Sequence, residues 1–242
     1  MTSPVFFLGS AATVAVGEVV GLDGPEGRHA ADVRRLRSGE RVTLTDGRGA
    51  SVTGRVVAVR QGGLDVAVED TVVHPPRLPR LVVAQALAKG GRDEDAVEAM
   101  TEIGVDEVIG WAASRSIARW TDRTSRRWSA TIEAAAKQSR RVWWPAASGP
   151  VTTAELADRC RDAGQALILH EAATESLAEL AFDSTDDVLL VVGPEGGITD
   201  DELAAFRAAG AVAVRLGVEV LRSSTAGVAA LAAICADSRW RS

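Results

Sequence analysis

The chain has 242 residues, of which 46% are hydrophobic and 25% charged, which is ordinary for a globular protein with one large domain or two small ones. No segment has the roughly 18 uncharged apolar residues of a membrane span, and the start MTSPVFFLGS lacks the basic region and long apolar run of a signal peptide. We therefore expect a cytoplasmic protein with no membrane partner, and the net charge of −6 argues against nonspecific coating of nucleic acid.

The first third of the chain predicts one helix followed by a small β unit. A helix is predicted over residues 29–37, and residues 42–69 alternate between glycine-rich turns, as antiparallel strands do. The segment TDGRGASVTG at 45–54 has the glycines of a dinucleotide-binding loop, but an alternating strand follows where such a loop needs a helix, so a hairpin is predicted. HPPRLP at 74–79 breaks regular structure and separates a predicted domain 1–73 from a predicted domain 74–242.

Strands and helices alternate after this boundary. Residues 188–192 are apolar without polar alternation, as in a strand buried on both faces, and Thr199 with Glu202 has capping-box spacing for a helix that ends at Gly210. The pattern predicts an α/β fold with a parallel sheet covered on both faces. The other predicted strands are 81–87, 105–111, 166–171 and 212–217, and the other predicted helices are 93–104, 126–141 and 225–237.

Basic residues are unevenly distributed. From Arg115 to Arg141 eight basic residues face two acidic ones, and a second basic run lies within residues 28–37. A solvated helix face explains either run alone, but two runs in an acidic chain favour a polyanionic partner. Five tryptophans lie within or beside the longer run, and a place in the core or a dimer interface is favoured for them over base stacking: Trp111, Trp120, Trp128, Trp143 and Trp144.

The sequence contains no motif that indicates a metal site or a reactive thiol. Cys160 and Cys235 stand alone, and His29, His74 and His170 make no ligand spacing, so we expect buried thiols and no metal. There is also no P-loop and no nucleophile elbow. Three loops remain, LHEAATE (169–175), GPEGGIT (193–199) and LGVEVLRSSTAG (216–227), each after a predicted strand. Because parallel sheets bind ligands at the carboxyl ends of their strands, the three together predict a ligand site.

GPEGGITDDE at 193–202 with RLGVEVLRSSTA at 215–226 resembles the C-terminal signature of the RsmE-type ribosomal RNA methyltransferases of the SPOUT superfamily. TEIGVDEV (101–108), SRS (114–116), KQSRRVWWP (137–145) and EGRHAADVRRLRSGE (26–40) extend the resemblance almost end to end, in the expected order. The chain departs from the pattern at Ser224, where many members have Glu, and at Ala99, where many have Lys.

The resemblance implies an α/β SPOUT-type C-terminal domain with a trefoil knot and a parallel sheet, a small N-terminal PUA-like β-barrel, and a homodimer. It implies S-adenosylmethionine as methyl donor, no metal, and N3 of uridine 1498 of 16S rRNA in the small ribosomal subunit as target. Alternatives are another rRNA target such as a ribose 2′-hydroxyl, or a non-catalytic RNA-binding assembly factor. The candidate RNA-binding residues are Arg28, Arg34, Arg35, Arg37, Arg115, Gln138, Arg140 and Arg141.

The resemblance also implies a donor held mainly by loop backbone, with glycines allowing close approach and leucine and isoleucine side chains enclosing the adenine. Glu195 either bonds a ribose hydroxyl or orients its loop. Arg222 is the candidate for stabilising the deprotonated uracil imide, and the proton acceptor is His170, Glu171 or a water. The candidate cofactor-binding residues are Leu169, His170, Gly193, Pro194, Glu195, Gly196, Gly197, Ile198, Leu216, Gly217, Leu221, Arg222, Ser223, Thr225 and Ala226.

Overall fold

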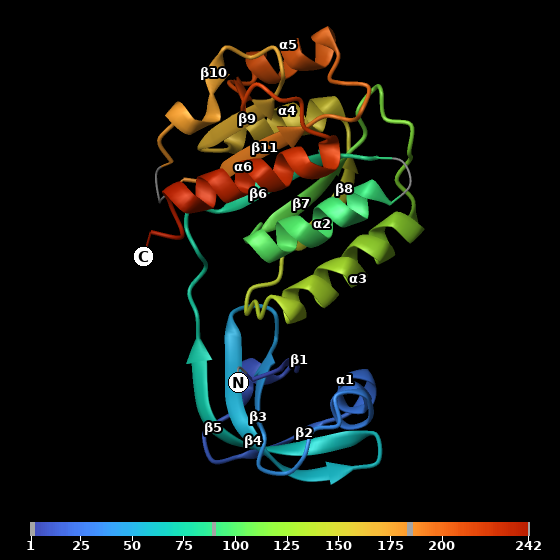
Figure 1. Cartoon of the computed structure of the whole chain (residues 1–242), viewed down its shortest axis with the longest axis vertical. Helices are drawn as coiled ribbons and strands as arrows, with labels where there is room; N and C mark the ends of the chain where they lie inside the picture. Colours follow the sequence, from blue (N-terminus) through green and yellow to red (C-terminus); the bar gives the residue numbers. More distant parts are fainter. Residues whose placement is uncertain (1–2, 89–90, 183–185, 242) are drawn as a thin grey trace. The chain divides into compact units, whose positions relative to one another are not determined.

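A computed structural model describes residues 3–88, 91–182 and 186–241 (Figure 1). The chain forms two compact units: an N-terminal unit of Met1–Pro76 with Ala136–Trp144, and a C-terminal unit of Arg77–Ala135 with Pro145–Ser242. The sequence pattern had assigned all of residues 74–242 to one domain. The presence of Ala136–Trp144 in the N-terminal unit is therefore a feature that local patterns did not predict.

The N-terminal unit contains a curled sheet with the strand order β1-β3-β4-β5-β2. β1 pairs in parallel with β3, and the remaining pairings are antiparallel, which confirms the predicted antiparallel unit and its hairpin. Buried side chains such as Phe6, Leu44 and Leu64 form its core. The strands are β1 (Val5–Phe7), β2 (Val19–Leu22), β3 (Arg41–Thr45), β4 (Ala50–Arg60) and β5 (Gly63–Val73).

The helix predicted over residues 29–37 is misplaced. A 3-10 turn η1 (Ala11–Thr13) comes first in this part of the chain. The helical segment itself begins earlier than predicted, with a short helix α1 (Gly24–Arg28) that continues directly into a π-helical turn η2 (His29–Val33). Pro25 in the first turn starts α1, because proline lacks only an N–H that a helix start leaves unbonded. Arg35 has a φ of 53°, outside the right-handed helical region, so the helix ends before Arg37.

The segment 136–144 is fixed to the N-terminal unit by backbone and side-chain bonds. Gly49 N donates to Val142 O at 2.9 Å, and Trp144 N donates to Gly47 O at 2.9 Å. A Cβ at Gly49 would lie 2.5 Å from the ring of Trp143. The glycines of the β3–β4 turn thus make room for two tryptophans, and they do not form a ligand loop.

The C-terminal unit contains a seven-stranded sheet with the order β10-β12-β9-β11-β6-β7-β8. All of these pairings are parallel, which confirms the predicted sheet. β11 has the predicted bounds, and the edge strands β8 and β10 were not predicted. The strands are β6 (Leu81–Ala86), β7 (Glu107–Trp111), β8 (Ala146–Val151), β9 (Gln165–Leu169), β10 (Glu175–Ser176), β11 (Val188–Val192) and β12 (Val212–Arg215).

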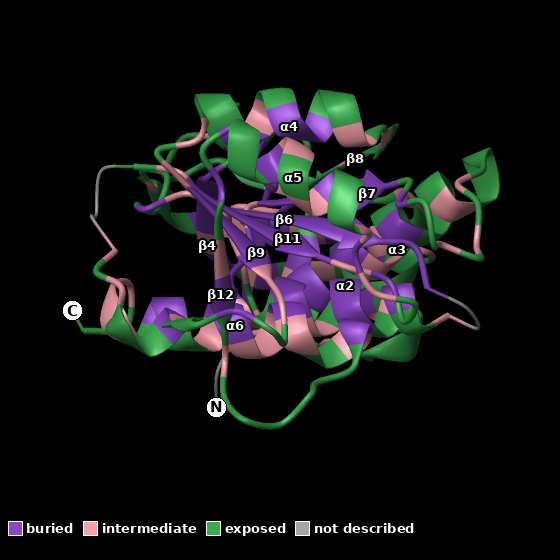
Figure 2. Cartoon of the chain, turned by 90° about the horizontal axis from the view of Figure 1, so that it is seen from above, coloured by how far each residue is buried: buried purple, intermediate pink, exposed green. Residues whose placement is uncertain are grey.

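Helices cover both faces of this sheet (Figure 2). α2 (Arg92–Ile103), α3 (Asp122–Gln138) and α6 (Ser223–Asp237) supply one apolar layer, while α4 (Thr153–Asp162) and α5 (Asp200–Ala208) supply the other. A 3-10 turn η3 (Leu177–Glu179) follows β10. α4 was not predicted, although Thr152 and Glu155 form a capping box at its start.

The two cysteines are buried and unbonded to each other, as predicted. Burial raises the pKa of the Cys160 thiol to about 11, so this side chain stays a protonated, unreactive thiol near neutral pH. Within the described ranges, no helix is long and apolar enough to cross a bilayer. Among the same residues, no group of three His, Cys, Asp or Glu side chains is placed to hold a metal ion.

Candidate functional site

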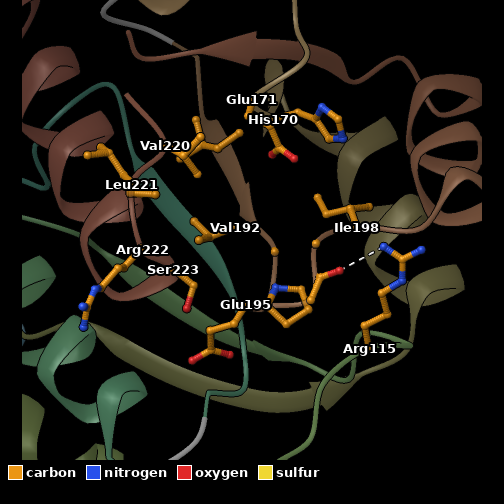
Figure 3. A pocket seen from close by; sticks show the side chains of 16 residues that line it. Arg115, His170, Glu171, Val192, Glu195, Ile198, Val220, Leu221, Arg222 and Ser223 are labelled. Carbon is orange, nitrogen blue, oxygen red and sulfur yellow. Dashed lines mark hydrogen bonds between the residues drawn. The ribbon is translucent and has the colours of Figure 1, made fainter. Parts of the chain in front are cut away.

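The three predicted loops meet at the carboxyl ends of β9, β11 and β12 and line two adjacent cavities, of which Figure 3 shows the larger. The larger cavity has a volume of about 440 Å³ and the smaller about 240 Å³. Leu169, Glu171 and Leu221 line both. The larger cavity is lined by Arg115, Leu169, His170, Glu171, Val192, Gly193, Pro194, Glu195, Gly196, Gly197, Ile198, Val220, Leu221, Arg222, Ser223 and Ala226.

The structure brings nearly all the predicted donor-site residues to these cavities. Leu216 and Gly217 line the smaller one. Thr225 does not line either cavity: it is exposed in the first turn of α6, where its N–H donates to Arg222 O at 2.9 Å. Arg115, which stays a predicted RNA contact, also lines the larger cavity.

The glycines of the loop after β11 are required by the protein itself. A Cβ at Gly193 would lie 2.7 Å from Ile198 Cγ1, too close for any real contact. Gly197 has a φ of 76°, in the left-handed region that side chains disfavour, and its N–H closes a turn onto Pro194 O at 2.9 Å. The loop therefore folds tightly over the end of β11 and presents its backbone at the cavity wall.

Glu202 fixes the end of this loop and was not predicted as a site residue. Its Oε2 accepts from Thr199 N and Oγ1, both at 2.9 Å, which is the predicted capping box, and its Oε1 accepts from Ser114 N at 2.7 Å. The side chain is only 3% exposed. Burial opposes ionisation, but the hydrogen bonds from Ser114 and Thr199 outweigh it and lower the pKa of Glu202, so the group remains a carboxylate.

Two arginine side chains from other parts of the chain contact the glycine loop. Arg115 Nη1 donates to Gly196 O at 2.9 Å, as the dashed line in Figure 3 shows. Arg92 Nη1 lies 3.6 Å from Glu195 Oε1, and both side chains are well exposed. The carbonyl and the carboxylate of this loop thus each have a cationic partner.

The candidate catalytic side chains lie on different sides of the larger cavity. His170 Nδ1 accepts from Ala172 N at 3.2 Å, so a neutral imidazole in this position carries its proton on Nε2. Glu171 is exposed beside it. Arg222 is exposed, and its guanidinium points away from the centre of the cavity in Figure 3.

Among the residues that the structure describes, two buried polar atoms near the cavities have no hydrogen-bond partner. Ser223 lines the larger cavity with 8% exposure, and its Oγ is unpaired. Gln85 is fully buried at the end of β6 beside Val192, with Nε2 donating to Ala86 O at 3.1 Å and Oε1 unpaired. Buried groups of this kind are costly unless a ligand completes them.

The remaining predicted RNA contacts lie in the N-terminal unit. Arg28, Arg34, Arg35 and Arg37 are exposed on and after α1 and η2. Gln138 and Arg140 are exposed and Arg141 is half-buried in the segment 136–144, which belongs to the same unit. Only the end of the longer basic run, with Lys137, Arg140 and Arg141, therefore belongs to the same folded unit as the run 28–37, and the rest of it lies in the C-terminal unit.

Comparisons with known families agree with this architecture. A model described as the RNA methyltransferase domain matches residues 75–235, and one described as the RNA methyltransferase PUA domain matches residues 22–69. The fold and the cavities thus belong to an RNA methyltransferase with an N-terminal PUA-like domain, which confirms the predicted α/β fold with a parallel sheet and a PUA-like N-terminal domain.

Individual relatives are more specific. The ribosomal RNA small subunit methyltransferase E of Mycobacterium bovis is 46% identical over 233 residues, covering 93% of this chain and 89% of the relative. The solved structure of ribosomal RNA small subunit methyltransferase E from Neisseria gonorrhoeae, bound to S-adenosyl methionine, is 27% identical with a TM-score of 0.85, covering 97% of this chain and 98% of that chain. The chain belongs to the ribosomal RNA small subunit methyltransferase E family, which confirms the predicted resemblance.

Proposed function

We propose that the protein transfers a methyl group from S-adenosylmethionine to N3 of uridine 1498 of 16S rRNA in the small ribosomal subunit. The observation that carries the proposal is the glycine-walled cavity at the carboxyl ends of β9, β11 and β12. The sequences of the loops after β11 and β12 carry the family resemblance. The binding of S-adenosyl methionine by the Neisseria gonorrhoeae relative supports the choice of donor.

The residues around the cavity fit this donor. Leu169, Ile198 and Leu221 provide apolar walls for an adenine ring, and the tight glycine loop lets backbone groups approach a ribose. Ser223 Oγ, buried and unpaired, offers a hydrogen bond to a polar part of the donor. When bound, S-adenosylmethionine supplies an electrophilic methyl group, so the protein mainly has to align it with N3.

The remaining chemical task is removal of the N3 proton. Uracil N3–H is a weakly acidic imide, and its loss leaves negative charge on the base that Arg222, once turned inward, stabilises. Glu171 is the better proton acceptor of the two neighbouring candidates. The reason is that His170 already uses Nδ1 to accept from Ala172 N, which leaves a donor at Nε2.

Binding of the target requires access to the Watson–Crick edge, where N3 lies, so the uridine must leave its stack. The arginines of the N-terminal unit, Arg28, Arg34, Arg35, Arg37, Arg140 and Arg141, are proposed to contact phosphates during this step. We further propose a homodimer, a trefoil knot in the C-terminal domain and a cytoplasmic location, as the family resemblance implies.

Transfer of tritiated methyl from S-adenosylmethionine to unmodified small ribosomal subunits, followed by mass spectrometry of the digested 16S rRNA, tests the proposal. The expected product is a single N3-methyluridine at position 1498. Label on a ribose 2′-hydroxyl or at another base would show that N3 of uridine 1498 is not the target. Donor binding without transfer to subunits or to naked rRNA would contradict the proposed substrate, and absence of donor binding would favour a non-catalytic assembly factor.

A further inference from the structure

The carboxylate of Glu202 joins two loops of the site through different oxygens. Oε2 serves only the capping box at the start of α5, where Thr199 N and Oγ1 donate at 2.9 Å. Oε1 reaches away from α5 to Ser114 N at 2.7 Å and Thr153 Oγ1 at 3.4 Å. A single buried side chain therefore ties the glycine loop after β11 to the loop after β7.

The loop after β7 continues this connection into the cavity wall. Arg115, next to Ser114, donates from Nη1 to Gly196 O at 2.9 Å and lines the larger cavity (Figure 3). The two loops are in close contact there, since a Cβ on Gly196 would lie 3.1 Å from Arg115 Cβ. The glycine loop is thus held at Thr199 directly by Glu202 and at Gly196 indirectly, through Ser114 and Arg115.

We propose that Glu202 is a positioning residue of the methyl-donor site, which fixes the glycine loop by holding Ser114 so that Arg115 bonds the Gly196 carbonyl. The inference rests on the proposed function and deepens it: the side chain does not contact the donor but shapes the wall that does. A wall held before the donor arrives lowers the ordering cost of binding.

The chain contains a matched control for this role. Glu155 forms the same capping box at the start of α4, where Thr152 N and Oγ1 donate to its Oε2 at 2.7 and 2.9 Å, but it is exposed. Glutamine also serves in a capping box, so Glu155→Gln keeps all of these contacts. In Glu202→Gln, by contrast, one backbone N–H, of Ser114 or of Thr199, must face the new amide N–H in either orientation of the side chain.

Titration calorimetry with S-adenosylmethionine on the purified full chain, without RNA, tests the proposal. We expect Glu202→Gln to weaken donor binding about tenfold, the loss of one hydrogen bond to a charged group, and Glu155→Gln to leave it within about twofold. In steady-state assays the donor KM should rise for Glu202→Gln while kcat at saturating donor changes little. Equal donor affinity of Glu202→Gln and the unchanged chain would overturn the proposal.

A second pair of variants tests the route through Arg115 and remains usable if Glu202→Gln does not fold. Arg115→Ala should weaken donor binding about tenfold, while Arg119→Ala, an exposed change in the same loop, should not alter it. The double variant Glu202→Gln/Arg115→Ala should lose less than the sum of the two single effects. If the losses of donor affinity were additive in the double variant, or if Arg115→Ala bound the donor as well as the unchanged chain does, Glu202 would not act through Arg115. Failure of the unchanged chain to bind the donor would instead overturn the proposed function.

Discussion

The two ends of the parallel sheet differ in how the buried polar groups named below are hydrogen-bonded. At the amino ends of the strands, Glu107 is 7% exposed and receives Arg80 at 2.5 Å and Arg159 at 3.0 Å. Asp106 bonds Leu81 N at 2.8 Å and pairs with Arg239. At the carboxyl ends, the buried oxygens of Gln85 and Ser223 have no partner within the described part of the chain, and tight glycine turns surround a cavity.

The contrast separates stability from function. Carboxylates whose hydrogen bonds are completed by arginines hold the strands together without needing any ligand. Unpaired buried oxygens cost free energy in the empty protein and gain partners only when a ligand binds. Substitutions at the amino ends should therefore change the free energy of unfolding, while those at the carboxyl ends should change binding or turnover.

Glu107→Ala should have the largest effect on the fold. The change leaves Arg80 and Arg159 without their shared carboxylate. Both arginines are about 40% exposed and Arg80 keeps Asp187, so we expect the free energy of unfolding to fall by about 2 kcal/mol, less than for a fully buried pair. Urea denaturation measures it. Asp158→Ala is the control, because it removes an exposed pair with Arg161 and should change little. If Glu107→Ala weakened donor binding and left the free energy of unfolding unchanged, the assignment of stability to the amino ends and of binding to the carboxyl ends would be wrong.

The same carboxylate gives a pH dependence. Burial disfavours the charged form of Glu107, but hydrogen bonds from Arg159 and Arg80 outweigh this and lower its pKa from the ordinary value of 4.5. A lowered pKa in the folded state means that the stabilisation is present above about pH 4.5 and is lost as the pH falls through the folded value. The stability difference between the unchanged chain and Glu107→Ala should therefore shrink below about pH 4.5.

At the carboxyl ends, Arg222→Ala should lower turnover about a hundredfold, the usual effect of removing one donor to a developing anion. Donor affinity should change far less, since the proposed role begins only when the base loses its proton. Single-turnover methyl transfer with saturating S-adenosylmethionine separates the two quantities. Arg222→Lys keeps the charge and should retain part of the rate; unchanged turnover of the alanine variant would remove Arg222 from the chemistry.

Gly193→Ala should lower donor affinity about tenfold, and the variant should still fold. Its Cβ would lie 2.7 Å from Ile198 Cγ1, so the loop must shift, at a cost of about 1–3 kcal/mol. Gly217→Ala is the comparison, because its Cβ would meet only Glu219 Oε2 at 3.5 Å. Calorimetric binding measures both. A loss at Gly217 as large as that at Gly193 would mean that the donor, and not Ile198, is what the added carbon meets.

Ser223→Ala should have the smallest effect and opposite signs on stability and binding. Removing a buried hydroxyl without a partner should stabilise the ligand-free protein by about 1 kcal/mol and weaken donor binding by a few fold. Thermal unfolding with and without S-adenosylmethionine shows both changes. Ser224→Ala, the next residue along α6, should leave both within about 0.5 kcal/mol. A destabilised ligand-free Ser223→Ala variant would show that the hydroxyl is satisfied within the protein.

Local patterns predicted the elements that position the site. The apolar run 188–192 formed a buried parallel strand, and the Thr199–Glu202 spacing formed a capping box. The loops after β9, β11 and β12 could be expected to meet because carboxyl ends of parallel strands share one edge. The strand β8 and the helix α4 went unpredicted, although the Thr152–Glu155 capping spacing was a usable signal for α4.

The sequence by itself determined the fold class, the family and the loops that wall the cavity, because these follow from hydrophobic period, caps and contiguous motifs. Only the tertiary structure decided that Arg115 bonds Gly196 O, that Glu202 reaches Ser114, and that residues 136–144 join the N-terminal unit. The physical reason is distance along the chain. A contact between residues 81 or 88 positions apart depends on strand order and packing, and no local pattern encodes either.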